Sequence, residues 1–296
     1  MKDFEAKRIL VPTDLSDSSR IAIKYARLLA GRLSSSLTLL YADPILYPID
    51  VMGVSSFYVG STPEQLTSLE TEVRAYAAAV LEGTDFDVVV VGGQPIPIIL
   101  REARKQSADM IVMATHGLRG WRRTVLGSVT EGVLHGAECP VLSICTAEAV
   151  TPPSDAVVTK ILCPVNFSDV ARESLRCAAR VAELFGAELV IAHVIEEKDA
   201  GQEAIDEQRV RRWIEPEIQD KCTFREIVLR GGAAERVLDC VEDIGADLLV
   251  IGAQHRMFRD ATVIGTTTER LVRFAQCAVL TVTRQAEGAE KPETLN

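Results

Sequence analysis

The sequence contains the same pattern twice, and this repeat constrains the fold more than any other feature. The segment RILVPTDLSDSSRIAIKYARLLAGRLSSSLTLLYAD at 8–43 matches KILCPVNFSDVARESLRCAARVAELFGAELVIAHVI at 160–195. Further along, ADMIVMATHG and TVLGSVTEGVL match ADLLVIGAQH and TVIGTTTERLV. Because 296 residues suffice for two domains of ordinary size, we expect two copies of one domain.

The spacing of equivalent residues shows where the copies differ in length. Asn166 follows Asp14 by 152 residues and Gly265 follows Gly127 by 138, so the second copy is 14 residues shorter. The simplest place for the loss is the region around PILYPIDVMGVSSFYVGS. We expect domains at 1–148 and 159–284, an extended linker at 149–158 that contains Pro152-Pro153, and a polar, disordered tail at 285–296.

Each copy alternates apolar runs with amphipathic segments, which predicts an α/β fold with a parallel sheet covered on both faces. Ser16 or Asp17, and Ser168 or Asp169, are suitable caps for the first helix of each copy. Ligands of such sheets bind beyond the carboxyl ends of the strands, where the strand order reverses. In the first copy the expected strands are Ile9–Val11, Leu37–Tyr41, Val88–Val91, Met110–Met113 and Val141–Ile144.

Composition excludes several classes of function. The formal net charge of −10 argues against a general nucleic-acid or membrane-surface binder, because such partners need a basic face. The N-terminus MKDFEAKRIL lacks the apolar core of a signal peptide, and no apolar run approaches the ~18 residues of a membrane span. The seven cysteines form no CxxC and the four histidines are scattered, so we expect a cytoplasmic protein without a metal site built from them.

The stretch MATHGLRGWRRTVLGSVTEG offers the parts of a phosphate site. Gly117 and Gly127 lack a Cβ and permit close approach to the backbone, and Ser128 lies at the start of a helix. Arg119, Arg122 and Arg123 make the nine-residue loop between the glycines positive. The alternative is a capped helix with a solvated loop. The usual P-loop is absent, since no Gly-Lys-Ser/Thr follows a glycine-rich turn.

The pattern small-x-x-Gly, nine residues, Gly-Ser, together with a first strand that ends in Pro-Thr-Asp, resembles the universal stress protein family. The resemblance covers both copies, so the chain looks like a tandem member. It implies two open, five-stranded parallel domains, Rossmann-like and related to the adenine nucleotide α-hydrolases. Family members commonly dimerise through the final strand, and a tandem chain could satisfy this pairing internally as a pseudo-dimer.

The same resemblance implies ATP as the ligand of the first copy, with or without Mg²⁺. Asp14 accepts hydrogen bonds from the nucleotide, the backbone at Ala42 faces the base, and Ala114 replaces a residue that is often Gly in the family. The implied nucleotide-binding residues are Pro12, Thr13, Asp14, Ala42, Met113, Ala114, Gly117, Gly127, Ser128, Val129 and Thr130.

The second copy departs from this pattern. Asn166 replaces the carboxylate of Asp14, and His255 stands where Gly117 stands. The loop 256–264 carries less positive charge than its counterpart, although Gly252, Gly265 and Thr266 are retained. We therefore expect the loop to keep its fold without the affinity, and one chain to bind one nucleotide.

Three kinds of function fit these observations. The first is a nucleotide-binding regulatory protein of the stress response, with an adenine nucleotide, unidentified proteins and further copies of the chain as partners. The second is an enzyme, which PTDLSD disfavours, because the related hydrolases carry Ser-Gly-Gly-x-Asp-Ser there; we expect no catalytic residues and at most slow ATP hydrolysis. The third is a scaffold that binds no nucleotide.

Overall fold

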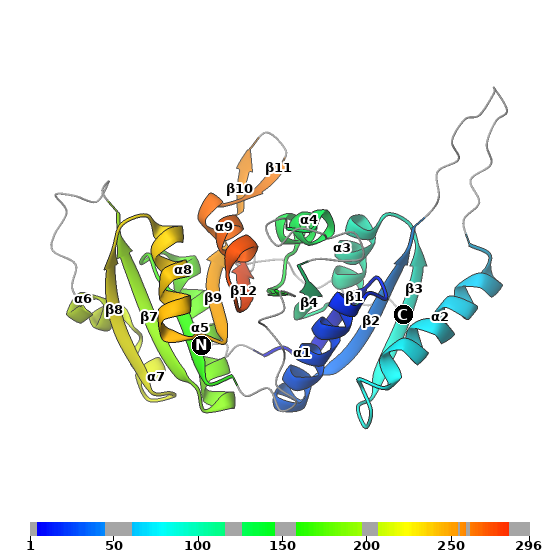
Figure 1. The fold of residues 1–296 in the computed structure, drawn as a ribbon, viewed down its shortest axis with the longest axis horizontal. Coiled ribbons are helices and arrows are strands. Elements are labelled where there is room, and N and C mark those ends of the chain that lie inside the picture. The colour runs from blue at the N-terminus through cyan, green and yellow to red at the C-terminus, as the bar shows by residue number, and fades with distance from the viewer. Residues whose placement is uncertain are drawn as a thin grey trace, which may run out of the picture.

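The computed structural model describes residues 5–44, 61–115, 126–145, 158–196, 207–253, 255–258 and 261–283. Ten strands form one sheet in the order β3-β2-β1-β4-β5-β12-β9-β6-β7-β8. Figure 1 shows the N-terminal half on the right, with β3 at its edge, and the C-terminal half on the left, with β8 at its edge. The expected linker and tail lie almost entirely outside the described residues.

The two halves have the same order of strands. Each contains five strands ordered 3-2-1-4-5, and the expected first-half strands are confirmed to within two residues at each end. The first half consists of β1 (Arg8–Thr13), α1 (Asp17–Leu33), β2 (Ser36–Asp43), α2 (Pro63–Ala78), β3 (Phe86–Gly92), α3 (Pro95–Lys105), β4 (Met110–Ala114), α4 (Ser128–Gly136) and β5 (Val141–Ile144).

The second half adds a short hairpin and a divided helix to the same plan. Its elements are β6 (Lys160–Pro164), α5 (Asp169–Phe185), β7 (Glu188–Ile195), α6 (Glu207–Trp213), α7 (Pro216–Gln219), β8 (Phe224–Arg230), α8 (Ala233–Ile244), β9 (Leu248–Ala253), β10 (His255–Phe258), β11 (Ala261–Ile264), α9 (Thr266–Phe274) and β12 (Ala278–Thr283).

The length difference between the halves lies between the second and third strands. β3 begins 43 residues after β2 ends, whereas β8 begins 29 residues after β7 ends, which accounts for the 14 residues. The single long helix α2 of the first half corresponds in this region to the shorter helices α6 and α7. The loss is therefore confirmed to lie in the region predicted from the sequence.

Helices cover both faces of the sheet and create two apolar cores. One core contains buried residues of α1, α2 and α5, and the other contains residues of α3, α4, α8 and α9. Since the central strands are buried on both faces, their sequences are continuous apolar runs rather than alternating ones, whereas the edge strands β3 and β8 are only partly buried. Among the described residues no helix combines the length and apolar character needed to cross a membrane.

The first helix of each half begins on the same turn. Ser16 and Ser168 are the N-caps, and their hydroxyls accept hydrogen bonds from the backbone N–H groups of Ser19 and Ala171. The residue before each cap has a positive φ, 62° at Leu15 and 61° at Phe167. The chain therefore enters a conformation that is uncommon for non-glycine residues at equivalent points of both halves.

The halves join through the final strand of each, as the sequence predicted. β5 and β12 are antiparallel, and Leu142 pairs with Leu280. These two leucines are equivalent residues, 138 positions apart, so a pseudo-two-fold axis passes between them. On the adjoining helices, the Arg32 guanidinium donates to the carbonyl of Leu184 at 3.3 Å.

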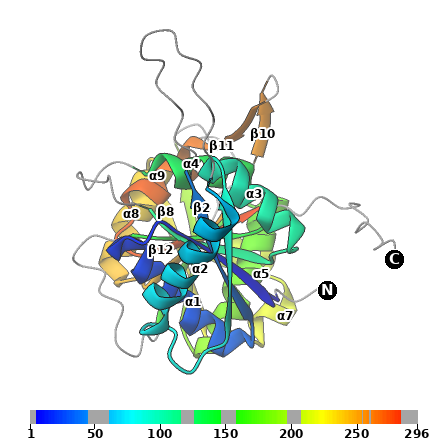
Figure 2. The ribbon, with the colours of Figure 1, turned by 90° about the vertical axis from the view of Figure 1, so that its right-hand side faces the viewer.

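One expectation about the second half is wrong. The segment 256–264 was expected to be a loop, but β10 and β11 pair as an antiparallel hairpin, from His255 with Ile264 to Phe258 with Ala261. The hairpin extends beyond the helices in both Figure 1 and Figure 2. β11 also contacts α4 of the first half. Four residue pairs between the two strands hold this ribbon together.

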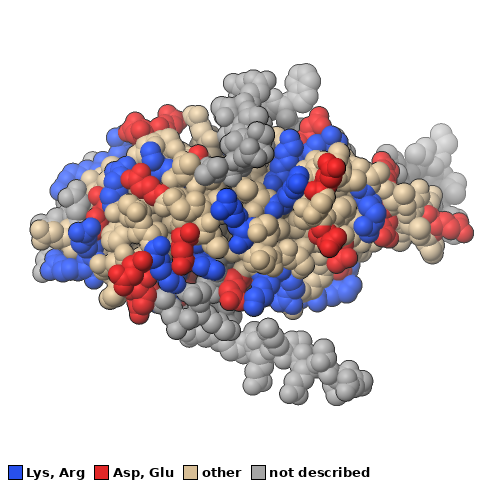
Figure 3. Space-filling model, turned by 90° about the horizontal axis from the view of Figure 1, so that it is seen from below, with Lys and Arg blue, Asp and Glu red and all other residues tan. Residues whose placement is uncertain are grey.

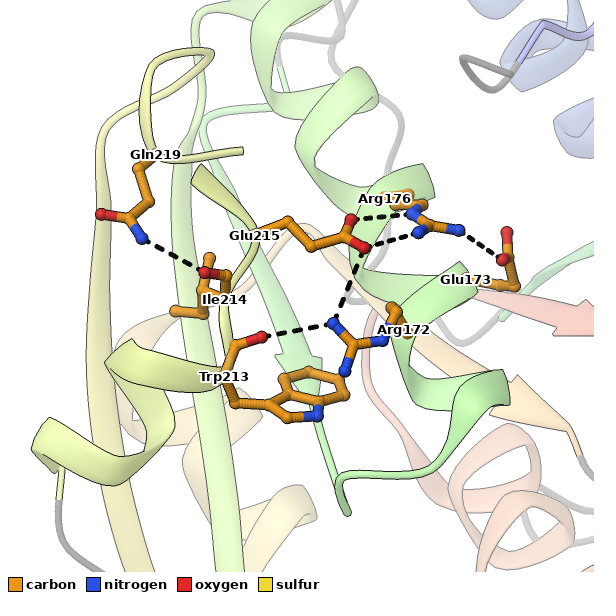
Figure 4. Close-up of polar contacts among 7 residues, drawn as sticks. All are labelled: Arg172, Glu173, Arg176, Trp213, Ile214, Glu215 and Gln219. Carbon is orange, nitrogen blue, oxygen red and sulfur yellow. Dashed lines mark hydrogen bonds and ion pairs between the residues drawn. The ribbon is translucent and has the colours of Figure 1, made fainter. Parts of the chain in front are cut away.

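A group of ion pairs anchors the segment after α6 to α5. The Glu215 carboxylate accepts from both Nε (2.8 Å) and Nη2 of Arg176, and Arg172 lies 3.6 Å from it (Figure 4). The Arg172 guanidinium also lies over the Trp213 ring, 4.5 Å from its centroid. This arrangement replaces the continuous packing that α2 gives the first half.

Charged side chains of both signs are mixed on the face at the bottom of Figure 1. Figure 3 shows Lys and Arg next to Asp and Glu across this face, over both halves. Helix α5 also carries neighbouring charges of opposite sign, since Arg176–Glu173 and Arg180–Glu183 have N–O distances of 2.6 and 2.7 Å. No field of a single sign dominates the face that is visible there.

Candidate functional site

The candidate site lies where the strand order of the first half reverses. β1 pairs with β2 on one side and with β4 on the other, so the chain turns in opposite directions after β1 and β4. A crevice forms outside the carboxyl ends of strands at such a point. Pro12, Thr13 and Asp14 lie at the end of β1, and Met113 and Ala114 at the end of β4.

The turn after β1 holds Asp14 in place through side-chain hydrogen bonds to the backbone. The Asp14 carboxylate accepts from the N–H of Ser16 at 3.1 Å, and the buried Thr13 hydroxyl accepts from the N–H of Leu15 at 3.1 Å. The Thr13 and Ser19 hydroxyls are 2.9 Å apart. Thr13 therefore shapes the turn, and the half-buried Asp14 brings a carboxylate to the strand ends.

Two hydrogen bonds tie the start of α4 to the end of β4. The Thr130 hydroxyl donates to the carbonyl of Ala114 at 2.8 Å, and the N–H of Gly127 donates to the carbonyl of Thr115 at 2.8 Å. The side chain of Thr130 is 3% exposed, so its part is to fix the helix rather than to reach a ligand. These bonds hold Gly127 and Ser128 beside the end of β4, the strand that pairs with β1.

The structure corrects the reason for a glycine at 127. A Cβ at this position would lie 2.7 Å from the carbonyl oxygen of Thr115, closer than a real Cβ approaches such an atom. Its φ is −62°, so the residue does not use the left-handed region. Gly127 allows the connection to close against its own backbone, with or without a ligand.

The first turn of α4 is open to solvent and has no side-chain cap. Gly127 is the N-cap and contributes no side chain, and Ser128 is exposed at the first helical position. The N–H groups of a first turn have no partner within the helix and carry the positive end of the helix dipole. An anion placed beside Ser128 would accept hydrogen bonds from these groups.

The remaining predicted residues lie on the α3 and α4 side of the sheet. Ala42, Met113 and Val129 all pack against the same apolar core. Ala42 lies one position beyond Tyr41, where the pairing of β2 with β1 ends. Met113 is buried within that core, and Ala42 and Val129 are half-buried against it.

The two sides of the crevice have opposite electrostatic character. Burial raises the pKa of the Tyr41 phenol, and the carboxylates of Asp43, Glu72 and Asp14 raise it further. On the α4 side, the helix N-terminus provides partial positive charge. The site can therefore accept hydroxyl donors at one end and an anion at the other.

Several predicted features lie outside the described residues. Gly117 and the arginines of loop 118–126 are among them, and so are His116 and Trp121. Their part in the site stays a prediction. Within the described chain there is no group of three or more His, Cys, Asp or Glu residues able to hold a metal ion.

Residues that the sequence pattern did not identify also shape the site. The buried Thr115 receives the Gly127 hydrogen bond, and its own N–H donates to the carbonyl of Ile144 at 3.0 Å. The Tyr76 hydroxyl on α2 donates to the carbonyl of Ser16 and lies 3.0 Å from the Ser19 hydroxyl. A side-chain hydroxyl beside a strand end is too common a signal to have indicated these roles.

The second half has the same turn and a different surface. Asn166 repeats the Asp14 contact, since its side-chain oxygen accepts from the N–H of Ser168 at 3.2 Å, but it brings no charge. Gly265 has open space around the position of a Cβ, unlike Gly127. His193 lies where Tyr41 lies and is buried, with Nδ1 2.8 Å from the carbonyl of Val165.

Gly252, the equivalent of Ala114, is a glycine for a packing reason. A Cβ there would lie 2.6 Å from the Val170 side chain and 2.9 Å from the Val170 carbonyl oxygen. The first half has Ser18 at the position of Val170, so its smaller side chain leaves room for Ala114. This glycine accommodates α5 and tells nothing about a phosphate.

Comparison with known proteins gives a consistent family match. The model of the universal stress protein family matches residues 5–144 and again 158–283. Universal stress protein Slr1230 of Synechocystis sp. is 27% identical over 297 residues, which cover 93% of this chain and 99% of that protein. Universal stress protein MJ0531 of Methanocaldococcus jannaschii is 34% identical over 148 residues, which cover 47% of this chain and 81% of that protein.

A solved structure supports the fold along the whole chain. The universal stress protein from Archaeoglobus fulgidus DSM 4304 superposes with a TM-score of 0.72 at 23% sequence identity. The superposition covers 95% of this chain and 100% of that one. The likeness supports the architecture of two halves in one chain.

Proposed function

Because this chain belongs to the universal stress protein family as a tandem member, we propose that its N-terminal half binds ATP and that occupancy regulates contacts with other proteins. The observation that carries the proposal is the arrangement at the β1–β4 switch point. There the Asp14 carboxylate follows β1, and the uncapped start of α4 at Gly127 and Ser128 is tied to the end of β4, the strand that pairs with β1. A nucleotide has hydroxyl donors at its ribose and anionic oxygens at its phosphates, in the matching order.

The acidic side fits a ribose. A carboxylate accepts hydrogen bonds from vicinal hydroxyls, and hydrogen bonds to charged groups contribute ~1.5–3 kcal/mol each. The Asp14 side chain is already oriented by its bond to Ser16, so little conformational entropy is lost on binding. The half-buried, apolar Ala42 and Val129 suit the apolar faces of a base.

The helix side fits a phosphate chain. The exposed first turn of α4 offers backbone N–H groups and the Ser128 hydroxyl, and the arginines of loop 118–126 add charge in the sequence. The dipole alone contributes ~0.3–1 kcal/mol to an anion at such a position. We propose regulation rather than turnover, because the described side chains at these strand ends contain no pair of nucleophile and base.

The second half is proposed to bind no nucleotide. Asn166 keeps the turn without the charge of Asp14. The equivalent of the phosphate loop is the hairpin β10–β11, whose backbone groups pair with each other from His255–Ile264 to Phe258–Ala261. Alternate amides of such a ribbon are engaged in its ladder and cannot also bind a phosphate, so we propose about one nucleotide per chain.

Isothermal titration of the full chain with ATP tests this proposal. Asp14→Asn copies the residue of the second half, retains an acceptor for Ser16 and removes only the charge, so the affinity should fall ~10- to 150-fold. The mirror variant Asn166→Asp is the matched control and should leave affinity and stoichiometry unchanged. A stoichiometry near two, or an Asp14→Asn variant as tight as wild type, would overturn the assignment.

A second titration separates the two sides of the site. Adenosine has the ribose and base of ATP without its phosphates, so it should bind more weakly if the start of α4 holds the phosphates. Ser128→Ala should weaken ATP and leave adenosine unchanged. Equal affinity of wild type for adenosine and ATP contradicts the phosphate assignment while leaving the ribose assignment intact.

A further inference from the structure

Two cysteines face each other at one end of the junction between the halves. Cys145 directly follows β5, and Cys277 directly precedes β12. The antiparallel register pairs Ser143 with Val279. Carried two positions further, the same register sets Cys145 opposite Cys277. Cys277 belongs to the same apolar core as Val279, and because side chains alternate with a period of two, we expect Cys145 to share the face of Ser143.

The electrostatics at this end of the junction involve both thiols. Burial raises the pKa of Cys277 to about 12, and a hydrogen bond from the backbone of Leu249 opposes this shift while the Cys145 thiol adds to it. The hydroxyl of Tyr25 responds to both thiols, since its pKa is raised by burial and then by Cys277, Asp247 and Cys145. The pairing predicted by the register therefore agrees with the influence of Cys145 on Cys277.

The two cysteines differ in access to solvent. Cys145 is half-buried, whereas Cys277 is 3% exposed. A small oxidant therefore reaches Cys145 first. Cys277 is shielded from the solution but belongs to the same cross-strand pair. A peroxide-reactive cysteine and the resolving cysteine that later forms a disulfide with it are arranged in this way.

We propose that Cys145 and Cys277 form an oxidation site at which a peroxide links the two halves through a disulfide. The Cys145 sulfur attacks one peroxide oxygen, the O–O bond breaks, and Cys145 becomes a sulfenic acid as water is released. The Cys277 sulfur then attacks the Cys145 sulfur, the S–S bond forms, and the hydroxyl leaves as water with the thiol proton. Two thiols are oxidised by two electrons and one peroxide is reduced to two waters.

The pseudo-symmetry of the junction supplies an internal comparison. The position equivalent to Cys277 is Cys139, and the position equivalent to Cys145 is Thr283. The same register sets Cys139 opposite Thr283, at the other end of the β5–β12 pair. Cys139 is therefore a cysteine at the position equivalent to Cys277, but the residue across the junction from it is a threonine and cannot form a disulfide.

Another neighbouring pair provides a contrast in burial. Cys163 and Cys177 belong to β6 and α5, and the Cys163 thiol contributes to the raised pKa of Cys177. They are 0% and 1% exposed, inside the core of the second half. A peroxide does not reach them in the folded chain, so they should stay reduced.

The experiment treats the folded, fully reduced chain with hydrogen peroxide, alkylates the remaining thiols after unfolding, and maps the unreduced peptides by mass spectrometry. We expect the number of free thiols to fall from seven to five, with one crosslinked peptide that joins Cys145 to Cys277. Dithiothreitol should restore all seven. Seven thiols after oxidation, or a crosslink between other cysteines or between chains, would overturn the proposal.

Variants distinguish a pair from two independent thiols. Cys277→Ser removes the resolving group, so Cys145 should remain as a sulfenic acid that dimedone labels. Cys139→Ser should crosslink like wild type, since Cys139 faces Thr283 and takes no part. Loss of the crosslink in Cys139→Ser, or a crosslink in Cys277→Ser at Cys145, contradicts the assignment; circular dichroism confirms that each variant is folded.

Discussion

The turns after β1 and β6 have the same backbone and different charge. Asp14 and Asn166 accept the same hydrogen bond, from Ser16 and Ser168 respectively, at 3.1 and 3.2 Å. The turn needs only an oxygen at this position, and either side chain provides one. The shared turn therefore does not distinguish the two side chains, and the negative charge of Asp14 is what separates the two halves at this position.

At the start of α4 and α9 the two halves have the same residue in different surroundings. Gly127 and Gly265 are both N-caps, with nearly the same φ, −62° and −60°. Yet only Gly127 lies against a carbonyl, that of Thr115, while Gly265 has open space and follows a hairpin. The glycine is thus the same in both halves, but the carbonyl contact that requires a glycine at position 127 has no counterpart among the described residues around position 265.

The comparison teaches that a shared motif residue must be explained in each half separately. Gly252 accommodates Val170, Gly127 accommodates Thr115, and the described surroundings of Gly265 give no packing reason for a glycine. Four pairs of matched substitutions can sharpen this difference between the halves.

The largest effect is expected at Gly252. Gly252→Ala forces a Cβ against the Val170 side chain and its carbonyl, and overpacking of this kind costs ~1–3 kcal/mol, here toward the upper end. Adding Val170→Ser copies the first half and should recover part of the loss. Urea unfolding of both variants measures the coupling, and purely additive losses would show that Val170 is not the cause.

Gly127 should be more sensitive than Gly265. Both glycines are N-caps, so replacing either one by alanine costs the same N-cap free energy. The difference in free energy of unfolding between the two alanine variants therefore isolates the contact of residue 127 with Thr115. We expect Gly127→Ala to reduce the free energy of unfolding by ~1–2 kcal/mol more than Gly265→Ala. Equal losses in chemical denaturation would refute the role given to Thr115.

The junction offers a third matched pair. The buried Thr281 hydroxyl donates to the carbonyl of Val141 at 3.0 Å, whereas the equivalent buried hydroxyl of Ser143 has no hydrogen-bond partner among the described residues. Thr281→Val should cost about 1 kcal/mol, and Ser143→Ala should be neutral or stabilising. Thermal unfolding would contradict this if Ser143→Ala proved the more damaging.

The smallest effect concerns acid stability of the second half. Arg176 lowers the pKa of Glu215 below its usual 4.5, so the pair stabilises the fold above pH 4.5 and this contribution is lost as pH falls through the lowered pKa. Glu215→Gln should cost ~0.5–1 kcal/mol at neutral pH and flatten the decline in stability below pH 4.5.

The control for that substitution is Glu173→Gln. Glu173 contacts Arg176 as well, at 2.6 Å, but its side chain is 46% exposed and lies outside the contact with Arg172. Its removal should leave the acid limb of the stability profile almost as in wild type. An unchanged acid limb in Glu215→Gln would show that the pair has no such role.

Much of the architecture follows from the sequence. Continuous apolar runs indicated the parallel strands, and the repeat indicated two halves that pair through Val141–Ile144 and Val279–Val282. The caps Ser16 and Ser168 are confirmed, because a hydroxyl three residues before a backbone N–H is a local signal. Features that depend on residues close together in the sequence could thus be predicted from the sequence.

Features that depend on contacts between residues far apart in the sequence could not be predicted from it. The hairpin was missed although HRMF and ATVI are separated by two residues, the spacing of a β-hairpin, because its counterpart suggested a loop. Spacing also could not reveal that Gly127 meets the carbonyl of Thr115 or that Gly252 meets Val170. Of the candidate site, the residues at the ends of β1 and β4 were predicted, and the reasons for its glycines were not.

The pairing of β5 with β12 has a consequence for the chain as it is made. β5 ends at Ile144 and its partner begins at Ala278, 134 residues later. At ~5–20 residues per second, a ribosome needs about 7–27 s to supply the missing strand. During this interval the nascent first half displays an unpaired strand edge, and two chains on neighbouring ribosomes can pair with each other instead. The fold therefore carries a risk of exchange between nascent chains that lasts until translation reaches β12.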